Sequence, residues 1–215
     1  MSKRFLLVAG NIGAGKTTIT DRLANRLGYE AGYESVAANP FLADFYGDMK
    51  QWSFHLQVYF LGDRANQHRR LATSPKSAII DRSIYEDAHI FARALHALGN
   101  MTERELDAYR ALYELVVGQL PSPDLLLYLE TSVPVLMDRI HGRGREIESG
   151  ITAEYLALLH SFYTEWIAGF DLCPVLTIPA DNLNFVTNEK HIQIIIDRIE
   201  QKLSGKEHVV FPENL

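Results

Sequence analysis

Residues 10–17 read Gly10-Asn11-Ile12-Gly13-Ala14-Gly15-Lys16-Thr17, and this stretch, GNIGAGKT, decides the fold class. It matches the pattern G-x-x-x-x-G-K-[ST] completely, with the apolar run Phe5–Ala9 before it and the helical pattern Lys16–Leu27 after it. Glycines in such a loop let successive amide groups turn toward one point, where the N-terminus of the following helix adds positive potential. The sequence therefore predicts a strand, a phosphate-binding loop and a helix, in that order.

The residues of this loop have distinct expected roles. Lys16 is expected to bridge the β- and γ-phosphates of a nucleoside triphosphate, and the Thr17 hydroxyl is an expected Mg²⁺ ligand. A glycine-rich turn without a ligand is the alternative, but the complete match in its strand–helix context argues against it. The predicted nucleotide-binding residues of the loop are Gly10, Asn11, Ile12, Gly13, Ala14, Gly15, Lys16, Thr17 and Thr18.

Outward from this loop, short apolar runs alternate with longer helical patterns. Strands are expected at Phe5–Ala9, Tyr29–Glu34, Ala78–Asp81, Leu125–Glu130 and Pro174–Ile178. Helices are expected at Lys16–Leu27, Gln51–Ala72, Ile84–Leu98, Thr102–Gln119, Val133–His141, Thr152–Phe170 and Asn188–Leu203. The alternation predicts an α/β fold, a three-layer sandwich around a five-stranded parallel sheet, in a single domain over residues 1–215. Ligands of such sheets bind at the carboxyl ends of the strands.

Composition narrows the possible partners. The 215 residues are 47% hydrophobic and 22% charged, with a formal net charge of -6, so the basic footprint of a nucleic-acid partner is missing. No uncharged apolar stretch approaches the roughly 20 residues of a membrane helix. The run Phe5–Ala9 is too short for the core of a signal peptide, and the only cysteine, Cys173, suits a reducing compartment. We expect a cytoplasmic protein without a nucleic-acid or membrane partner.

The phosphate loop alone does not separate kinases from GTPases and motor ATPases. A GTPase needs an Asn-Lys-x-Asp segment, which this sequence lacks, and no apolar strand leads into the polar machinery of a motor ATPase. Arg139, Arg143 and Arg145 lie around two glycines in the segment RIHGRGR, and guanidinium groups stabilise the charge that phosphoryl transfer spreads over oxygens. The small size of the chain and this arginine-rich segment favour a small-molecule kinase. For the arginines themselves, a solvated charge cluster is the alternative.

Three further motifs extend the pattern. Glu34-Ser35-Val36-Ala37-Ala38-Asn39-Pro40-Phe41-Leu42 begins at the end of the second strand, Trp52-Ser53-Phe54-His55-Leu56-Gln57 lies in a long helix, and Asp81-Arg82-Ser83 ends the third strand. Together with the phosphate loop they resemble the deoxyribonucleoside kinases, in particular bacterial deoxyadenosine, deoxycytidine and deoxyguanosine kinases, and the resemblance covers most of the chain. It implies P-loop kinase topology, with an arginine-rich lid near residues 142–151 that closes over the phosphates.

The resemblance also implies the catalytic residues. Glu34 is expected near the 5′-hydroxyl of a deoxynucleoside, where a carboxylate can accept the proton as the new bond forms. Asp81 is expected near Mg²⁺, although it is also a candidate for the proton acceptor, and Arg82 is expected to reach the acceptor hydroxyl and the phosphates. We favour Glu34 for proton removal and Asp81 for the metal. As a structural alternative, Asp81 or Ser83 caps the helix that begins near Ile84.

The predicted acceptor pocket centres on Gln57, an amide in an apolar run that is costly to bury unless it is paired. An amide carries both a donor and an acceptor, so it can pair with a nucleobase edge, whereas a glutamine bonded inside the core is the alternative. The resemblance implies that Gln57 pairs with the base, that Arg64 and Asp87 close over it, and that Phe91 stacks on it. A surface ion pair and a core aromatic are the alternatives for these last three.

The resemblance implies that Tyr46 and Glu148 hold the 3′-hydroxyl, with the Tyr46 ring crowding a 2′-hydroxyl, and that residues 181–186 wrap the donor adenine. We expect transfer of the γ-phosphate of ATP, with Mg²⁺, to a purine deoxynucleoside or deoxycytidine for nucleotide salvage. A nucleoside monophosphate kinase and a non-catalytic nucleotide-binding subunit are the alternatives. A homodimer through Ile84–Leu98 and Thr102–Gln119 is also expected, while the preferred base and donor stay open.

Overall fold

The computed structural model describes residues 3–33, 39–145, 150–185 and 187–205 of the chain. Five strands form one parallel sheet in the order β2-β3-β1-β4-β5, which confirms the predicted α/β architecture. Their bounds are β1 (Phe5–Gly10), β2 (Glu30–Gly32), β3 (Ala78–Asp81), β4 (Leu125–Glu130) and β5 (Val175–Pro179). Across the central pairs, Val8 of β1 lies opposite Asp81 of β3, and Gly10 lies opposite Leu129 of β4.

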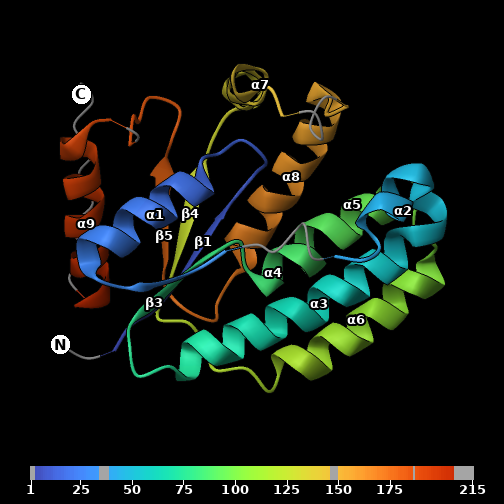
Figure 1. The fold of residues 1–215 in the computed structure, drawn as a ribbon, viewed down its shortest axis with the longest axis horizontal. Helices are drawn as coiled ribbons and strands as arrows, with labels where there is room; N and C mark the ends of the chain where they lie inside the picture. Colours follow the sequence, from blue (N-terminus) through green and yellow to red (C-terminus); the bar gives the residue numbers. More distant parts are fainter. Residues whose placement is uncertain (1–2, 34–38, 146–149, 186, 206–215) are drawn as a thin grey trace.

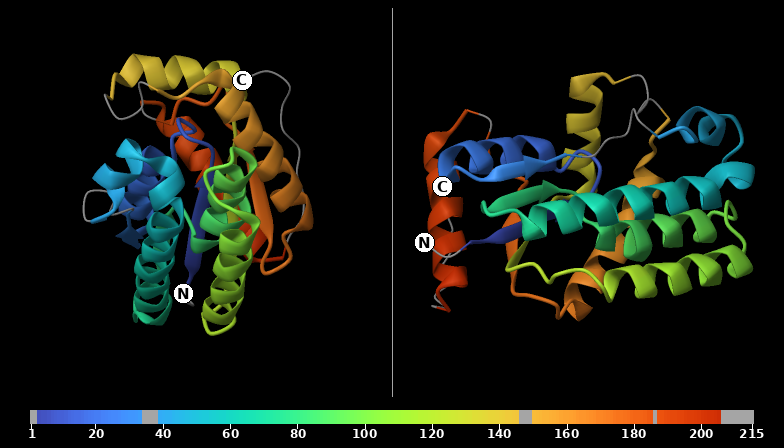
Figure 2. Two further views of the ribbon diagram at one scale, coloured as in Figure 1. Left: turned by 90° about the vertical axis from the view of Figure 1, so that its right-hand side faces the viewer. Right: turned by 60° about the horizontal axis from the view of Figure 1, so that its bottom comes forward.

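Helices cover both faces of this sheet, as Figure 1 shows. The first group is α1 (Lys16–Leu27), α7 (Val133–Arg143) and α9 (Glu189–Leu203). The second group is α3 (Met49–Thr73), α4 (Ile84–Glu86), α5 (Arg93–Ala97), α6 (Glu103–Val117) and α8 (Ala153–Gly169), with a short α2 (Leu42–Gly47) packed on α3. Figure 2 shows α7 crossing above the carboxyl end of β1, beyond the ends of the strands.

The alternation of side chains along the strands explains the two-sided core. Phe5, Leu7 and Ala9 of β1 belong to the hydrophobic cluster under α3–α6, whereas Leu6 and Val8 belong to the cluster under α1 and α9. Successive residues of a strand point to opposite faces, so a strand that is apolar throughout buries both of its faces. In the described part of the chain, no helix is long and apolar enough to cross a membrane.

Several predicted element bounds are corrected by the structure. The segment Ile84–Leu98 is not one regular helix, because a π-helical turn over Asp87–Ala92 separates α4 from α5. Gly142 and Arg143 do not interrupt α7, which continues through both and ends at Gly144, where φ is 58°. The short helix α2 was not predicted. The second strand is shorter than expected, and the end of its predicted range at Glu34 lies outside the described residues.

The sheet order places a topological switch point at β1. From β1 the chain passes to one side of the sheet to build β2 and β3, and it then crosses to the other side to build β4 and β5. The carboxyl ends of β1 and β3 therefore meet next to each other at the position where open parallel sheets bind ligands. This geometry brings the phosphate loop and the segment Asp81-Arg82-Ser83 together, although 64 residues separate Thr17 from Asp81.

Candidate active site

The phosphate loop leaves β1 in a conformation that depends on glycine. Gly10 has a φ of 152°, and a Cβ atom there would lie 3.0 Å from the Leu129 carbonyl oxygen. Gly15 has a φ of 97°, and a Cβ atom there would lie 2.7 Å from the Phe185 ring. Both positions are closed to other residues by backbone conformation and by contact, so the glycines of the motif fix the path of the loop.

The side chain of Lys16 is buried at the start of α1. Its Nζ donates to the carbonyl oxygens of Gly10 at 2.7 Å and Asn11 at 3.0 Å, which holds the charge against the loop. The Asn11 side chain itself points inward, because its Nδ2 donates to the Leu156 carbonyl at 3.0 Å. Asn11 thus stabilises the loop through its side chain and can offer a phosphate only its backbone.

Thr17 and Asp81 bring the two motifs into direct contact, since the Thr17 hydroxyl donates to the Asp81 carboxylate at 2.5 Å. Magnesium prefers oxygen ligands and is bound in kinases by one or two protein groups together with substrate phosphates. Among the described residues, no group of three or more His, Cys, Asp or Glu side chains could hold a metal. A hydroxyl and a carboxylate beside the phosphate loop nevertheless fit this sparse type of Mg²⁺ site.

Arg82 carries the only positive φ of a non-glycine residue in the described part of the chain, 68°. Residues held in this region cost of order 1–3 kcal/mol and concentrate at functional sites. The turn places the Arg82 guanidinium over the Phe91 ring, 4.4 Å from its centroid. Ser83 is the N-cap of α4, as one structural alternative predicted, and Asp81 is free of that role.

The predicted base-binding residues lie on α3 and on the π-helical turn over Asp87–Ala92, two elements that pack against each other. Gln57 is only 4% exposed, and its Oε1 has no hydrogen-bond partner within the described residues. Arg64 forms an ion pair with Asp87, and each of these side chains is 4% exposed, so the pair is buried and not at the surface. Asp87 and Phe91 both lie in the π-helical turn, whose wider spiral is often found at functional sites.

Tyr46 lies in α2, which packs on α3. It is 50% exposed, it packs edge-on against Phe45 of the same short helix, and it is close enough to Tyr155 to influence that hydroxyl electrostatically. Tyr155 comes from α8, so this proximity brings two distant parts of the sequence near each other. Glu34 and Glu148, the other two predicted acceptor-side residues, lie outside the described residues.

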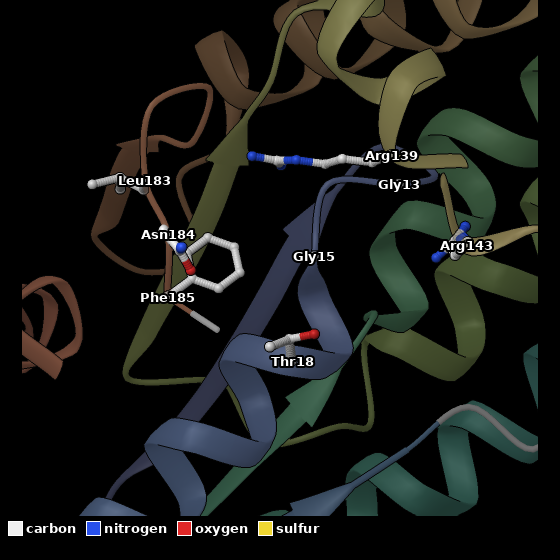
Figure 3. Close-up of a pocket in the computed structure, with 8 residues that line it drawn as sticks. All are labelled: Gly13, Gly15, Thr18, Arg139, Arg143, Leu183, Asn184 and Phe185. Atoms are coloured by element: carbon white, nitrogen blue, oxygen red, sulfur yellow. The ribbon is translucent and has the colours of Figure 1, made fainter. Parts of the chain in front are cut away.

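A cavity of about 450 Å³ opens on the other side of the phosphate loop (Figure 3). Arg139 spans it, donating to the carbonyl oxygens of Ala14 at 3.2 Å and Ala180 at 2.6 Å. Arg143 also lines it, on the opposite side of the loop from Phe185 in Figure 3, whereas Arg145 is exposed beyond the end of α7. The lining residues are Gly13, Gly15, Thr18, Arg139, Arg143, Leu183, Asn184 and Phe185.

Sequence reasoning missed Glu86 and Tyr163. Glu86 is fully buried and accepts four hydrogen bonds, one of them from the Tyr163 hydroxyl at 2.7 Å. The available signal was the spacing of Ser83 and Glu86, which is that of a capping box. Nothing in the sequence connects Tyr163 with Glu86, because 77 residues separate them.

Known proteins resemble this chain over most of its length. A family model described as deoxynucleoside kinase matches residues 6–204. A deoxyadenosine/deoxycytidine kinase of Bacillus subtilis (strain 168) is 39% identical over 196 residues, which cover 90% of each chain. A deoxyadenosine kinase of Lactobacillus acidophilus is 36% identical over 208 residues, covering 92% of this chain and 95% of the relative.

Solved structures agree as well. The deoxyadenosine kinase from M. mycoides with products dCMP and dCDP bound is 30% identical, with a TM-score of 0.80 over 92% of this chain and 99% of that one. The chain therefore belongs to the deoxynucleoside kinase family. It is a phosphotransferase that binds nucleotides and phosphorylates deoxynucleosides, as the sequence motifs predicted.

Proposed function

We propose that this enzyme transfers the γ-phosphate of ATP to the 5′-hydroxyl of deoxyadenosine or deoxycytidine in a Mg²⁺-dependent reaction. The observation that carries the proposal is the double contact of one segment, Asp81-Arg82-Ser83. Asp81 contacts Thr17 of the phosphate loop at 2.5 Å, and Arg82 lies over Phe91 of the acceptor side, 4.4 Å from the ring centroid. Donor and acceptor groups therefore converge at the ends of β1 and β3.

Catalysis by these residues is mainly positioning and charge stabilisation. Lys16 would leave its two carbonyl contacts to bind the β- and γ-phosphates, while Arg139 and Arg143 border the phosphate loop from α7. Thr17 and Asp81 would hold Mg²⁺, which when bound neutralises charge on the bridging phosphate oxygens. Arg145 would contribute from the lid.

Proton removal from the acceptor hydroxyl is assigned to Glu34, with Asp81 on the metal. The contact of Asp81 with Thr17 supports this division, since it holds the carboxylate on the phosphate side. Amide variants of the two acids separate the roles in single-turnover experiments at saturating Mg²⁺. Loss of chemistry in Asp81→Asn together with near-normal chemistry in Glu34→Gln would reverse the assignment.

The choice of base rests on Asp87 and Gln57. Adenine and cytosine each present an exocyclic amino group beside a ring nitrogen, whereas thymine presents a carbonyl oxygen at the corresponding position. The buried Asp87 carboxylate can accept from that amino group and would repel the thymine oxygen, while Gln57 Oε1 supplies a second buried acceptor. The relative at 39% identity is named deoxyadenosine/deoxycytidine kinase, which supports the same pair. Because a relative at 35% identity is named deoxyguanosine kinase, deoxyguanosine belongs in the acceptor panel as well.

A coupled assay of ADP release tests the proposal with ATP, Mg²⁺ and a panel of acceptors. Deoxyadenosine and deoxycytidine should give the highest kcat/KM, and thymidine should fall at least about tenfold below them because it leaves buried polar groups unpaired. dAMP and dCMP belong in the panel, because faster turnover of these would favour the nucleoside monophosphate kinase. Equal rates for thymidine, or no turnover of any deoxynucleoside, would refute the proposal.

We also propose a cytoplasmic homodimer. Leu112 and Leu115, three residues apart on α6, are 42% and 68% exposed, so this helix offers an apolar surface, and Leu98 after α5 is 51% exposed as well. The single Cys173 suits a reducing cytoplasm. Sedimentation should give twice the mass of one chain, and Leu115→Glu should shift it to the monomer; a monomeric wild type would contradict the proposal.

A further inference from the structure

Glu86 is an ionisable residue that phosphoryl transfer, as described above, does not use. It ends α4, directly before the π-helical turn, and its exposed fraction is 0%. A carboxylate buried this completely is costly unless its oxygens are all paired. Its partners therefore show what the residue contributes.

Four donors from three segments surround the carboxylate. Oε1 accepts from the backbone N–H of Gly10 at 3.2 Å and from the Tyr163 hydroxyl at 2.7 Å. Oε2 accepts from the backbone N–H of Ser83 at 2.7 Å and from the Ser83 hydroxyl at 3.2 Å. One side chain is thus bonded to the first residue of the phosphate loop, to the residue after Arg82, and to α8.

The backbone of Gly10 is held at both its N–H group and its carbonyl oxygen. Its N–H donates to Glu86, while its carbonyl oxygen accepts from Lys16 at 2.7 Å and lies 2.9 Å from the Tyr163 hydroxyl oxygen. Burial, with the nearby Glu86 charge as the next cause, raises the pKa of Tyr163, so its hydroxyl keeps its proton and remains a donor. If Lys16 moves to a bound phosphate, Glu86 still accepts from the Gly10 N–H, and Tyr163 still holds the Glu86 carboxylate in place.

We propose that Glu86 is a positioning residue which, with Tyr163, fixes the phosphate loop relative to Asp81-Arg82-Ser83. The inference rests on the proposed function, because the loop carries the donor phosphates and Arg82 lies on the acceptor side. In-line transfer depends on this relative placement, and a shift of about 1 Å can cost about 100-fold in rate. Each half keeps its own binding groups when Glu86 changes, so the expected loss lies in kcat and not in either KM.

Glu86→Gln replaces one acceptor oxygen by an NH₂ donor that would face other donors. We expect its kcat to fall about 100-fold, with the KM values for ATP and the deoxynucleoside within about threefold of wild type. Tyr163→Phe removes one donor of four, so its kcat should fall about tenfold with the same unchanged KM values. Because the two residues act through one contact, Glu86→Gln/Tyr163→Phe should lose little more than Glu86→Gln alone.

The chain offers a matched control in Glu105, which forms a second capping box on the surface. Its Oε2 accepts from the Thr102 backbone N–H at 2.7 Å and from the Thr102 hydroxyl at 2.8 Å, as Glu86 does with Ser83. Both of these hydrogen bonds stay within the capping box and do not involve the phosphate loop. Glu105→Gln should therefore leave kcat unchanged. A kcat loss in Glu105→Gln equal to that in Glu86→Gln would reduce the effect to helix capping and overturn the proposal.

To separate a folding defect from a loss of positioning, we would measure the urea unfolding of each variant and assay its activity under conditions where it is fully folded. If Glu86→Gln does not fold, Tyr163→Phe decides: an unchanged kcat, or a raised KM with kcat retained, overturns the proposal. An unchanged kcat in folded Glu86→Gln overturns it too. The wild-type enzyme is assayed first, so failure of the proposed function would appear as no turnover of any deoxynucleoside, independently of every variant.

Discussion

Removing one member of the buried Arg64–Asp87 ion pair should cost more stability than removing both members together. Each side chain is 4% exposed, so replacing one leaves the other as an uncompensated buried charge, which costs about 3–5 kcal/mol. We expect Arg64→Met and Asp87→Asn each to lower the free energy of unfolding by about 3 kcal/mol. The double variant should lose less than either single variant, and far less than the sum of about 6 kcal/mol, because it leaves no lone charge.

The assay is urea unfolding at pH 7, followed by circular dichroism for the four members of the cycle. Glu165 supplies the control: it pairs with Arg93 at 2.8 Å but is 66% exposed, so Glu165→Gln should cost less than about 1 kcal/mol. Losses below about 1 kcal/mol in both single variants, or a double variant equal to their sum, would mean that solvent reaches the pair. Either result would refute the description of this pocket as desolvated.

Three further predictions concern the loop, the core and the sugar. Gly10→Ala should reduce ATP affinity at least about tenfold, because Gly10 has a φ of 152° and the added Cβ would lie 3.0 Å from the Leu129 carbonyl oxygen. Calorimetry measures this affinity, and an unchanged value would contradict the prediction. Burial lowers the pKa of His68, so its stabilising contribution is complete above the unfolded pKa of 6.5 and is lost as pH falls below it. Between pH 7.5 and 5, the free energy of unfolding measured in urea should therefore fall with pH by up to about 1.4 kcal/mol per pH unit, and His68→Gln should flatten this slope. An equal slope in the variant would exclude His68 as the cause. Tyr46→Ala should raise kcat/KM for adenosine relative to deoxyadenosine at least about tenfold, and an unchanged ratio would remove Tyr46 from sugar selection.

The parts of the fold that were predictable are those with a local cause. The helix Lys16–Leu27 and the strands Ala78–Asp81 and Leu125–Glu130 have the predicted bounds, because glycines, apolar runs and charged flanks mark their ends in the sequence. The capping box of Thr102 and Glu105 at the start of α6 has a local cause of the same kind, a threonine followed three residues later by a glutamate. Each of these signals lies within a few residues of the feature that it fixes.

The rest depends on contacts that no local pattern carries. Glycine in a helix costs only about 1 kcal/mol, so packing of α7 and the two bonds of Arg139 can keep Gly142 helical. The π-helical turn over Asp87–Ala92 has no sequence signature of its own, and it lies where α3, α6 and α8 all pack on it. The pairing of Arg64 with Asp87 followed from the family resemblance, since no local spacing connects these two positions and a surface ion pair was the alternative.

The segment Asp81-Arg82-Ser83 explains why the strain at Arg82 is retained. Its three consecutive side chains serve three different neighbours: Asp81 contacts Thr17, Arg82 lies over Phe91, and Ser83 donates to Glu86. An extended strand would send alternate side chains to opposite faces, and a helix would turn all three away from the end of the sheet. A single left-handed residue between the strand and the helix permits all three directions, and its cost of order 1–3 kcal/mol is offset by the contacts on either side. The site is therefore organised at this turn as much as at the phosphate loop.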